Sequence, residues 1–211
     1  MHAQDPGELF DVVTESGEPT GITKPRAQVH RDGDWHRAVH VWVHGVDAEG
    51  PYVMLNQRGK QKDTWPLALD ATVGGHLGAG ETVEDAFREV EEEIGVRFDP
   101  ERIEWIFQRK RSSGDLIPGV LDREIQEVFV VRDDRPLGAY LPNPAELEGL
   151  VKVQLADFAD LANGEEDAVT GRVLDASTGE IRDHQLTTEQ LLVRGDDPYF
   201  KDVATEIGKR A

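Results

Sequence analysis

The chain has 211 residues, with 23 Lys and Arg against 42 Asp and Glu, a formal net charge of −19 and no cysteine. This length suits one domain, and the missing cysteines exclude disulfides, thiolate metal ligands and cysteine nucleophiles. An acidic chain repels nucleic acids and anionic membranes, so a phosphate ligand here needs a cation as partner. No basic segment followed by an apolar one opens the chain, and a cytoplasmic location is expected.

The first part of the chain predicts two β-hairpins joined by a histidine-rich link. Residues 8–13 alternate apolar and polar side chains, and the Gly and Pro of 15–21 predict a turn. Residues 38–43 and 52–57 predict two further strands on either side of a turn at 47–50.

Strands and short helices are expected in the rest of the chain around one clear helix at Thr82–Ile94, which has a capping pattern at Thr82 and Gly95 at its end. The later elements are strands at 105–107, 125–131 and 150–153, a helix at 156–161, a hairpin at 173–182 and a closing helix at 198–210. The expectation is a single α+β domain over 1–211, with an N-terminal arm to about 35, a core to about 165 and a C-terminal hairpin and helix.

The helix at Thr82–Ile94 carries an acidic cluster. At 100° per residue, its apolar side chains fall on one face and the carboxylates of Glu89, Glu92 and Glu93 on another. Carboxylates at i, i+3 and i+4 repel each other unless something positive lies between them, and clustered oxygen ligands suit Mg²⁺ or Mn²⁺. A solvated acidic helix face is the alternative.

The glycine-rich loop before this helix gives the pattern its specificity. Gly75, five residues, Glu81 and then Arg88-Glu89-Val90-Glu91-Glu92-Glu93-Ile94-Gly95-Val96 resemble the Nudix box. Every specified position of the tail of the box is filled. The spacing from Glu81 to Arg88 is one residue shorter than in the family pattern, which rotates Glu81 by about 100° on a helix.

The resemblance implies a Nudix fold, a mixed β-sheet sandwiched between helices, with an N-terminal hairpin extension. It implies that Glu92 and Glu93 bind Mg²⁺ or Mn²⁺ and that Glu89 ligates the metal or helps to activate water. It gives Arg88 and Glu81 structural roles. Divalent metals neutralise a diphosphate and lower the pKa of water, so the implied reaction is hydrolysis of a diphosphate bond.

A second resemblance extends beyond the box. The stretches Phe10–Val13, Gly21–Arg26 and Val29–Val41, together with Trp65-Pro66 and Gly75-His76, resemble Nudix proteins related to isopentenyl-diphosphate isomerase. That resemblance implies a second divalent-metal site at His30, His36 and His76, with Asp122 and Glu124 as acids from a later strand. Such a mixed set suits Mn²⁺, Fe²⁺ or Zn²⁺, and hydrogen-bonded histidines without a metal are the alternative.

Hydrolysis is favoured over isomerisation. The isomerase pattern uses a cysteine beside the glycine and histidine turn, and this chain has none, whereas the tail typical of the hydrolases is complete. The expected substrate is a nucleoside diphosphate linked to another moiety or a similar small diphosphate, bound by Gly75, Arg58 and Lys60. A non-catalytic sensor that binds such a ligand is a further alternative, and a homodimer built through the N-terminal hairpin is considered.

Overall fold

A computed structural model describes residues 7–62, 65–117, 120–193 and 195–211, without the side chains of 114–117 and 120. The chain forms two compact units. Unit 1 comprises Met1–His40, Gly74–Glu89 and Trp105–Phe129, and unit 2 comprises Val41–Val73, Val90–Glu104 and Val130–Ala211. The expectation of one domain over the whole chain stays a prediction.

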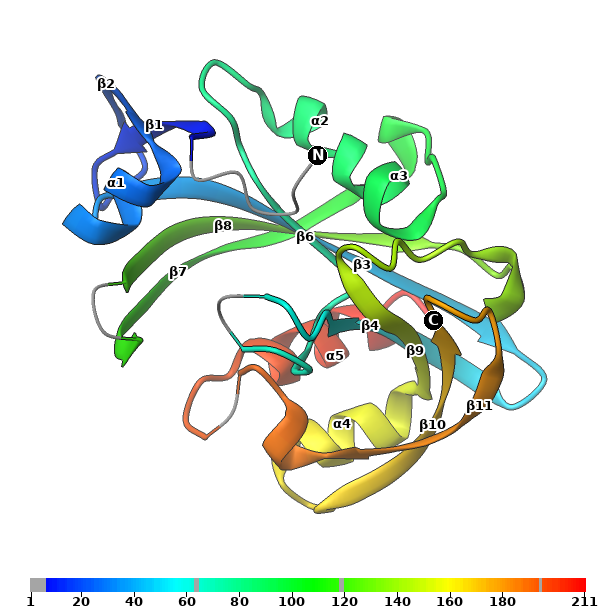
Figure 1. The fold of residues 1–211 in the computed structure, drawn as a ribbon. Helices are drawn as coiled ribbons and strands as arrows, with labels where there is room; N and C mark the ends of the chain where they lie inside the picture. Colours follow the sequence, from blue (N-terminus) through cyan, green and yellow to red (C-terminus); the bar gives the residue numbers. More distant parts are fainter. Residues whose placement is uncertain (1–6, 63–64, 118–119, 194) are drawn as a thin grey trace. The chain divides into compact units, whose positions relative to one another are not determined.

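Unit 1 is built on antiparallel strands. Its elements are β1 (Leu9–Val13), β2 (Pro19–Pro25), α1 (Arg26–Asp32), the first part of β3 (Trp35–Asp47), most of β6 (Val73–His76), α2 (Val83–Ala86) and most of β7 (Glu104–Ile117) and β8 (Val120–Arg132). In Figure 1, β1, β2 and α1 lie together at the blue end of the chain. The predicted N-terminal hairpin is confirmed by the pairing of β1 with β2.

The histidine-rich link contains a helix that the sequence analysis missed. Helix α1 ends at Gly33, which has a φ of 68° and donates its backbone N–H to the carbonyl of Val29. A Cβ at Gly33 would lie 3.0 Å from Leu121, so glycine allows both the left-handed turn and the close approach. Strand β3 begins at Trp35, two residues after Gly33.

The expected helix over Thr82–Ile94 is two shorter helices, α2 and α3 (Arg88–Ile94), separated at Phe87. The predicted capping box of Thr82 and Asp85 is present. Phe87 donates its N–H to the carbonyl of Glu84 three residues earlier, which tightens the turn, and its ring packs edge-on against Phe129. The expectation of one continuous helix is therefore wrong at this residue.

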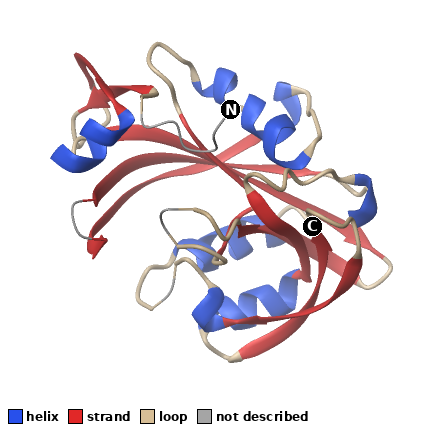
Figure 2. Cartoon of the chain, in the orientation of Figure 1, coloured by secondary structure: helices blue, strands red, loops and turns tan. Residues whose placement is uncertain are grey.

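Unit 2 combines strands with two packed helices (Figure 2). It contains β4 (Gly50–Arg58), β5 (Leu69–Ala71), β9 (Leu147–Gln154), α4 (Leu155–Asn163), β10 (Ala168–Asp175), β11 (Ile181–Thr187), α5 (Tyr199–Gly208) and the short helical turns η1 (Pro100–Arg102), η2 (Leu137–Ala139) and η3 (Thr188–Gln190). Strand β9 pairs antiparallel with β4 and β10, and β11 completes the predicted C-terminal hairpin. Among the described residues, no helix is long and apolar enough to cross a membrane.

Aromatic side chains form the core of unit 2. Trp42 of β3 lies edge-on to Phe200, and its Nε1–H donates to the hydroxyl of Tyr199 at 2.9 Å. Phe158 brings α4 against α5, and all four rings are buried. Burying such large side chains stabilises the unit more than any single hydrogen bond in it.

Candidate functional site

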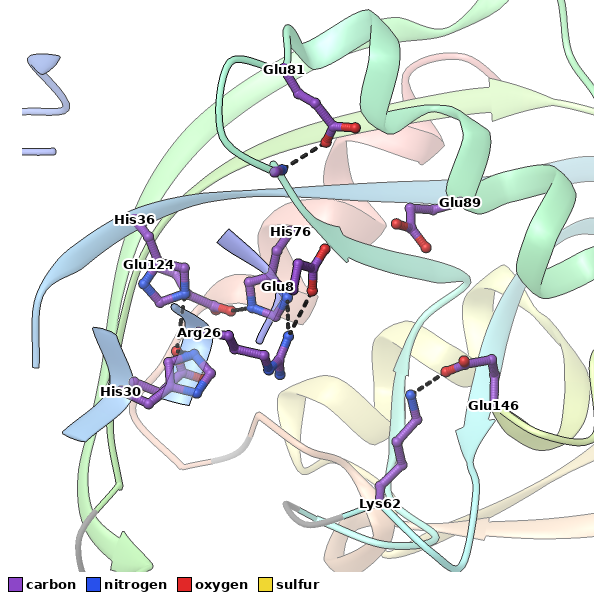
Figure 3. Close-up of polar contacts among 12 residues, drawn as sticks. Glu8, Arg26, His30, His36, Lys62, His76, Glu81, Glu89, Glu124 and Glu146 are labelled. Carbon is purple, nitrogen blue, oxygen red and sulfur yellow. Dashed lines mark hydrogen bonds and ion pairs between the residues drawn. The ribbon is translucent and has the colours of Figure 1, made fainter. Parts of the chain in front are cut away.

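Three histidines from three different elements meet in unit 1. His30 comes from α1, His36 from β3 and His76 from β6, and the ring centroids of His30 and His36 are 5.1 Å apart. One nitrogen of each ring and a carboxylate oxygen of Asp122 on β8 lie within 4.8 Å of one another. Buried Phe10 of β1 stacks on the rings of His36 and His76 and fixes their orientation. Figure 3 shows the three histidines gathered beside Arg26 and Glu124.

The nitrogens of this histidine cluster suit a metal ion. The Nδ1–H of His36 donates to the backbone carbonyl of Asp34 at 3.3 Å, which leaves Nε2 with its lone pair. Among the described residues, neither His36 Nε2 nor His30 Nε2 has a hydrogen-bond partner. Both atoms are buried, and they lie 3.6 Å and 3.7 Å from Asp122 Oδ1. Burial lowers the pKa of His36, and it lowers the pKa of His30 to about 4, so both imidazoles are neutral at pH 7.

His76 has partners on both ring nitrogens. Arg26 Nη1 lies 3.0 Å from Nδ1, and Glu124 Oε1 lies 3.0 Å from Nε2. Because a guanidinium only donates, Nδ1 must accept and the proton is on Nε2, which donates to Glu124. Burial and the charge of Arg26 lower the pKa of His76 to about 3. A metal ion bound to His76 would therefore replace one of these two hydrogen bonds.

Strand β8 places its acidic residues Glu124 and Glu127 on opposite faces, because side chains alternate along a strand. Glu124 is buried and faces His76, and it also accepts a hydrogen bond from Nε2 of Gln126. Glu127 points to the other face, where it accepts from Trp105 Nε1 at 3.0 Å and Gln108 Nε2 at 2.8 Å. The sequence analysis gave no role to Gln126, although the period of two along β8 places Gln126 on the face of Glu124.

The glycine loop and the start of α3 form the second group of predicted residues in unit 1. Gly75 packs against Glu89 so closely that a Cβ at Gly75 would lie 2.4 Å from Glu89 Cγ. Glu81 accepts the backbone N–H of Gly78 at 2.6 Å and pairs with Arg88 at 2.8 Å. Arg88 also lies 3.1 Å from a carboxylate oxygen of Glu89. These contacts hold the loop against the first residues of α3, and Figure 3 shows Glu81 and Glu89 among them.

Helix α3 continues into unit 2, where it carries Glu92 and Glu93. Glu92 is exposed, whereas Glu93 is buried with only 6% of its surface accessible. The expected separation of acidic and apolar faces is therefore wrong for Glu93, because this residue lies only about 60° around the helix from buried Val90. Glu89, Glu92 and Glu93 are spaced at i, i+3 and i+4, so Glu92 and Glu93 lie one helical turn after Glu89.

Two lysines of the predicted basic loop in unit 2 have acidic partners. Lys60 pairs with Glu148 at the surface, and the less exposed Lys62 pairs with Glu146. Gly59 donates its N–H to the carbonyl of Glu146 at 2.9 Å, which fixes the loop that follows Arg58. Lys62 belongs to the same basic loop as Arg58 and Lys60, and it is the more enclosed of the two lysines.

Comparisons with known proteins agree with the resemblance of residues 75–96 to the Nudix box. The NUDIX domain model matches residues 34–175. Nudix hydrolase 3 of Arabidopsis thaliana is 34% identical over 179 residues, which is 83% of this chain but only 23% of that protein. An isopentenyl-diphosphate Delta-isomerase of Paenarthrobacter aurescens is 32% identical over 155 residues, covering 72% of this chain and 79% of that one. A crystal structure from Deinococcus radiodurans superposes with a TM-score of 0.53 at 23% identity, covering 75% of this chain and 91% of that one.

The chain belongs to the Nudix family. The predicted α+β Nudix fold, the likeness to the isomerase-like subgroup and the class of enzyme, a Nudix pyrophosphohydrolase, are confirmed. The family uses divalent metal ions. The substrate of this chain, its reaction and the roles of single residues are proposals.

Proposed function

We propose that the chain hydrolyses a diphosphate bond in a nucleoside diphosphate linked to another moiety, or in a similar small diphosphate, with Mg²⁺ or Mn²⁺. The observation that carries this proposal is the close packing of Gly75 against Glu89 at the start of a helix that presents the complete acidic tail of the box. The Nudix hydrolases among the relatives support the reaction class.

In this proposal Glu89, Glu92 and Glu93 hold the divalent ion, which when bound neutralises phosphate charge and makes water more acidic. Glu89 orients the attacking water and accepts its proton. Arg88 neutralises part of the acidic charge and braces Glu89, because its guanidinium pairs with Glu81 and Glu89 together. Arg58, Lys60 and Lys62 contact the anionic substrate, which for the two lysines must compete with Glu148 and Glu146.

A second divalent ion, Mn²⁺, Fe²⁺ or Zn²⁺, is proposed for His30, His36, His76 and Asp122, with Glu124 as a further acid. The observation that favours it is the pair of buried Nε2 atoms that have no hydrogen-bond partner in the described residues. The same site supports the alternative reaction, isomerisation of a small isoprenoid diphosphate, because an isomerase is among the relatives. Gly74 and Gly75 supply no acid beside His76, which favours hydrolysis.

The test is phosphate-product release from a panel of nucleoside diphosphate derivatives and isopentenyl diphosphate, with Mg²⁺ or Mn²⁺. Native protein is compared with Glu92→Gln, and with His36→Ala as the matched variant at the other site. Metal-dependent cleavage that is lost in Glu92→Gln and retained in His36→Ala supports the hydrolase. Isomerised isopentenyl diphosphate without cleavage supports the isomerase, and ligand binding without either reaction supports a sensor.

A further inference from the structure

The end of helix α3 is held by one short segment of unit 2. The last carbonyls of a helix have no partner within the helix, and a helix as short as α3 depends strongly on groups that satisfy them. Leu141 donates its backbone N–H to the carbonyl of Ile94 at 3.0 Å, and Asn143 donates its own to the carbonyl of Glu93 at 2.8 Å. The side-chain Nδ2 of Asn143 reaches the carbonyl of Glu92 at 3.3 Å.

The sequence of this segment suits the task. In Leu141-Pro142-Asn143-Pro144 the two prolines have no N–H, so the only backbone donors are those of Leu141 and Asn143, and both are used on α3. The prolines also restrict the unfolded chain and reduce the entropy lost on ordering. Gly95, at a φ of 69°, lets the segment approach, because a Cβ there would lie 2.6 Å from Leu141 Cβ.

Asn143 itself is fixed by the turn that follows. Its Oδ1 accepts the N–H of Ala145 at 3.0 Å, so Nδ2 is the end that faces the helix. Its carbonyl accepts the N–H groups of Glu146 and Leu147 at 3.0 Å and 2.9 Å. Glu146 in turn pairs with Lys62, so one turn connects the end of α3 with the basic loop of the same unit (Figure 3).

We propose that Asn143 is a positioning residue for the metal-binding glutamates, because its side chain and backbone hold the carbonyls of Glu92 and Glu93 in the last turn of α3. This inference rests on the proposed function of those two glutamates. Without the Nδ2 contact the last turn frays, and binding a metal ion must then also order the helix end. The expected effect is weaker metal binding by a protein that is still folded.

The experiment compares Asn143→Ala and Asn143→Asp with native protein. The Asp variant keeps the acceptor for Ala145, loses the donor to Glu92 and adds a negative charge at the end of the helix, whereas Leu141→Ala is the matched control because it keeps the backbone donor and removes a side chain that is 72% exposed. The probe is Mg²⁺ alone, measured by calorimetric titration, because imidazole sites prefer other divalent metals. The melting temperature, kcat and KM are recorded for each variant.

Both Asn143 variants are expected to raise the Mg²⁺ dissociation constant by about fivefold, the effect of losing one hydrogen bond, with Leu141→Ala unchanged. They are expected to lower kcat at saturating substrate more than they raise KM. A lower melting temperature with unchanged Mg²⁺ binding and kcat would overturn the inference. Glu93→Gln separates the two proposals. If Glu93→Gln leaves Mg²⁺ binding intact, the proposed function is wrong. If Glu93→Gln weakens Mg²⁺ binding but the Asn143 variants leave it intact, the inference about Asn143 is wrong.

Discussion

A single methyl group at Gly75 tests whether Glu89 acts at the reacting centre. The added Cβ of Gly75→Ala would lie 2.4 Å from Cγ and 2.9 Å from Cδ of Glu89, far inside normal contact. To restore an ordinary contact distance of 3.4 Å, Glu89 Cγ must move by about 1 Å. The nearer atom is in the middle of the side chain, so rotation of the carboxylate alone does not relieve the clash.

A displacement of this size at a group that orients the reacting water costs about 100-fold in rate. We expect Gly75→Ala to lower kcat for diphosphate cleavage by about that factor, with a much smaller change in KM. The substitution lies in a strand and adds one methyl group, so the protein should remain folded. The assay is steady-state cleavage of whichever diphosphate the panel identifies, at saturating metal.

The neighbouring glycine supplies the control. A Cβ at Gly74 would meet Cδ2 and Nε2 of His40 at 3.6 Å, an ordinary van der Waals distance. Gly74→Ala should therefore keep kcat within about twofold of native, because no side chain needs to move by the 1 Å that costs rate. Equal losses in both variants, or native activity in Gly75→Ala, would refute the idea that the position of Glu89 controls the rate.

Three further predictions concern stability. Glu81→Gln should change the free energy of unfolding by less than about 1 kcal/mol in urea, because its partner Arg88 is partly exposed; a larger loss would contradict this. Burial lowers the pKa of His44 to about 4, so this residue alone should contribute a loss of up to about 3 kcal/mol as pH falls from about 6.5 to 4, since the unfolded chain binds the proton first. The histidine cluster adds its own loss over the same range, and His44→Asn should remove only the share of His44. Tyr199→Phe leaves Nε1 of Trp42 without its acceptor and should cost about 1–3 kcal/mol in the same assay, whereas no loss would mean that water replaces the hydroxyl.

Strands and hairpins followed from alternation and turn residues, and most elements lie where the sequence places them. The break at Phe87 could not be predicted, because it depends on the edge-on contact with Phe129, a residue 42 positions later in the chain. Helix α1 was missed for a different reason. Its seven residues follow a proline and include only two apolar side chains, Ala27 and Val29, a composition without the apolar periodicity of a longer helix.

The candidate site was predictable where a motif fixes the spacing. Glu89, Glu92 and Glu93 are neighbours by helix geometry alone, and the pairing of Arg88 with acids follows from the crowding of carboxylates around it. The meeting of His30 with His76 depends on long-range strand pairing, and only the resemblance predicted it. The role proposed for Asn143 is invisible in the sequence, because the carbonyls that it contacts lie about 50 residues earlier and no motif marks it.

The glutamates of α3 and the histidine cluster offer different ligand atoms and so suit different metal ions. The glutamates of α3 offer only oxygen and suit a hard ion that stays partly hydrated and exchanges with the medium, as a phosphate-bridging ion must. The histidine cluster offers two neutral nitrogens without hydrogen-bond partners and one carboxylate, all nearly removed from solvent, so it suits a more tightly held transition metal. Protonating an alkene further requires a proton donor beside such a metal. Both nitrogens of His76 are already engaged with Arg26 and Glu124, and the residues before it are glycines, so neither His76 nor the glycines supply that acid. The proposed hydrolysis needs water, a divalent ion and the carboxylates that would hold it, and this chain retains those carboxylates.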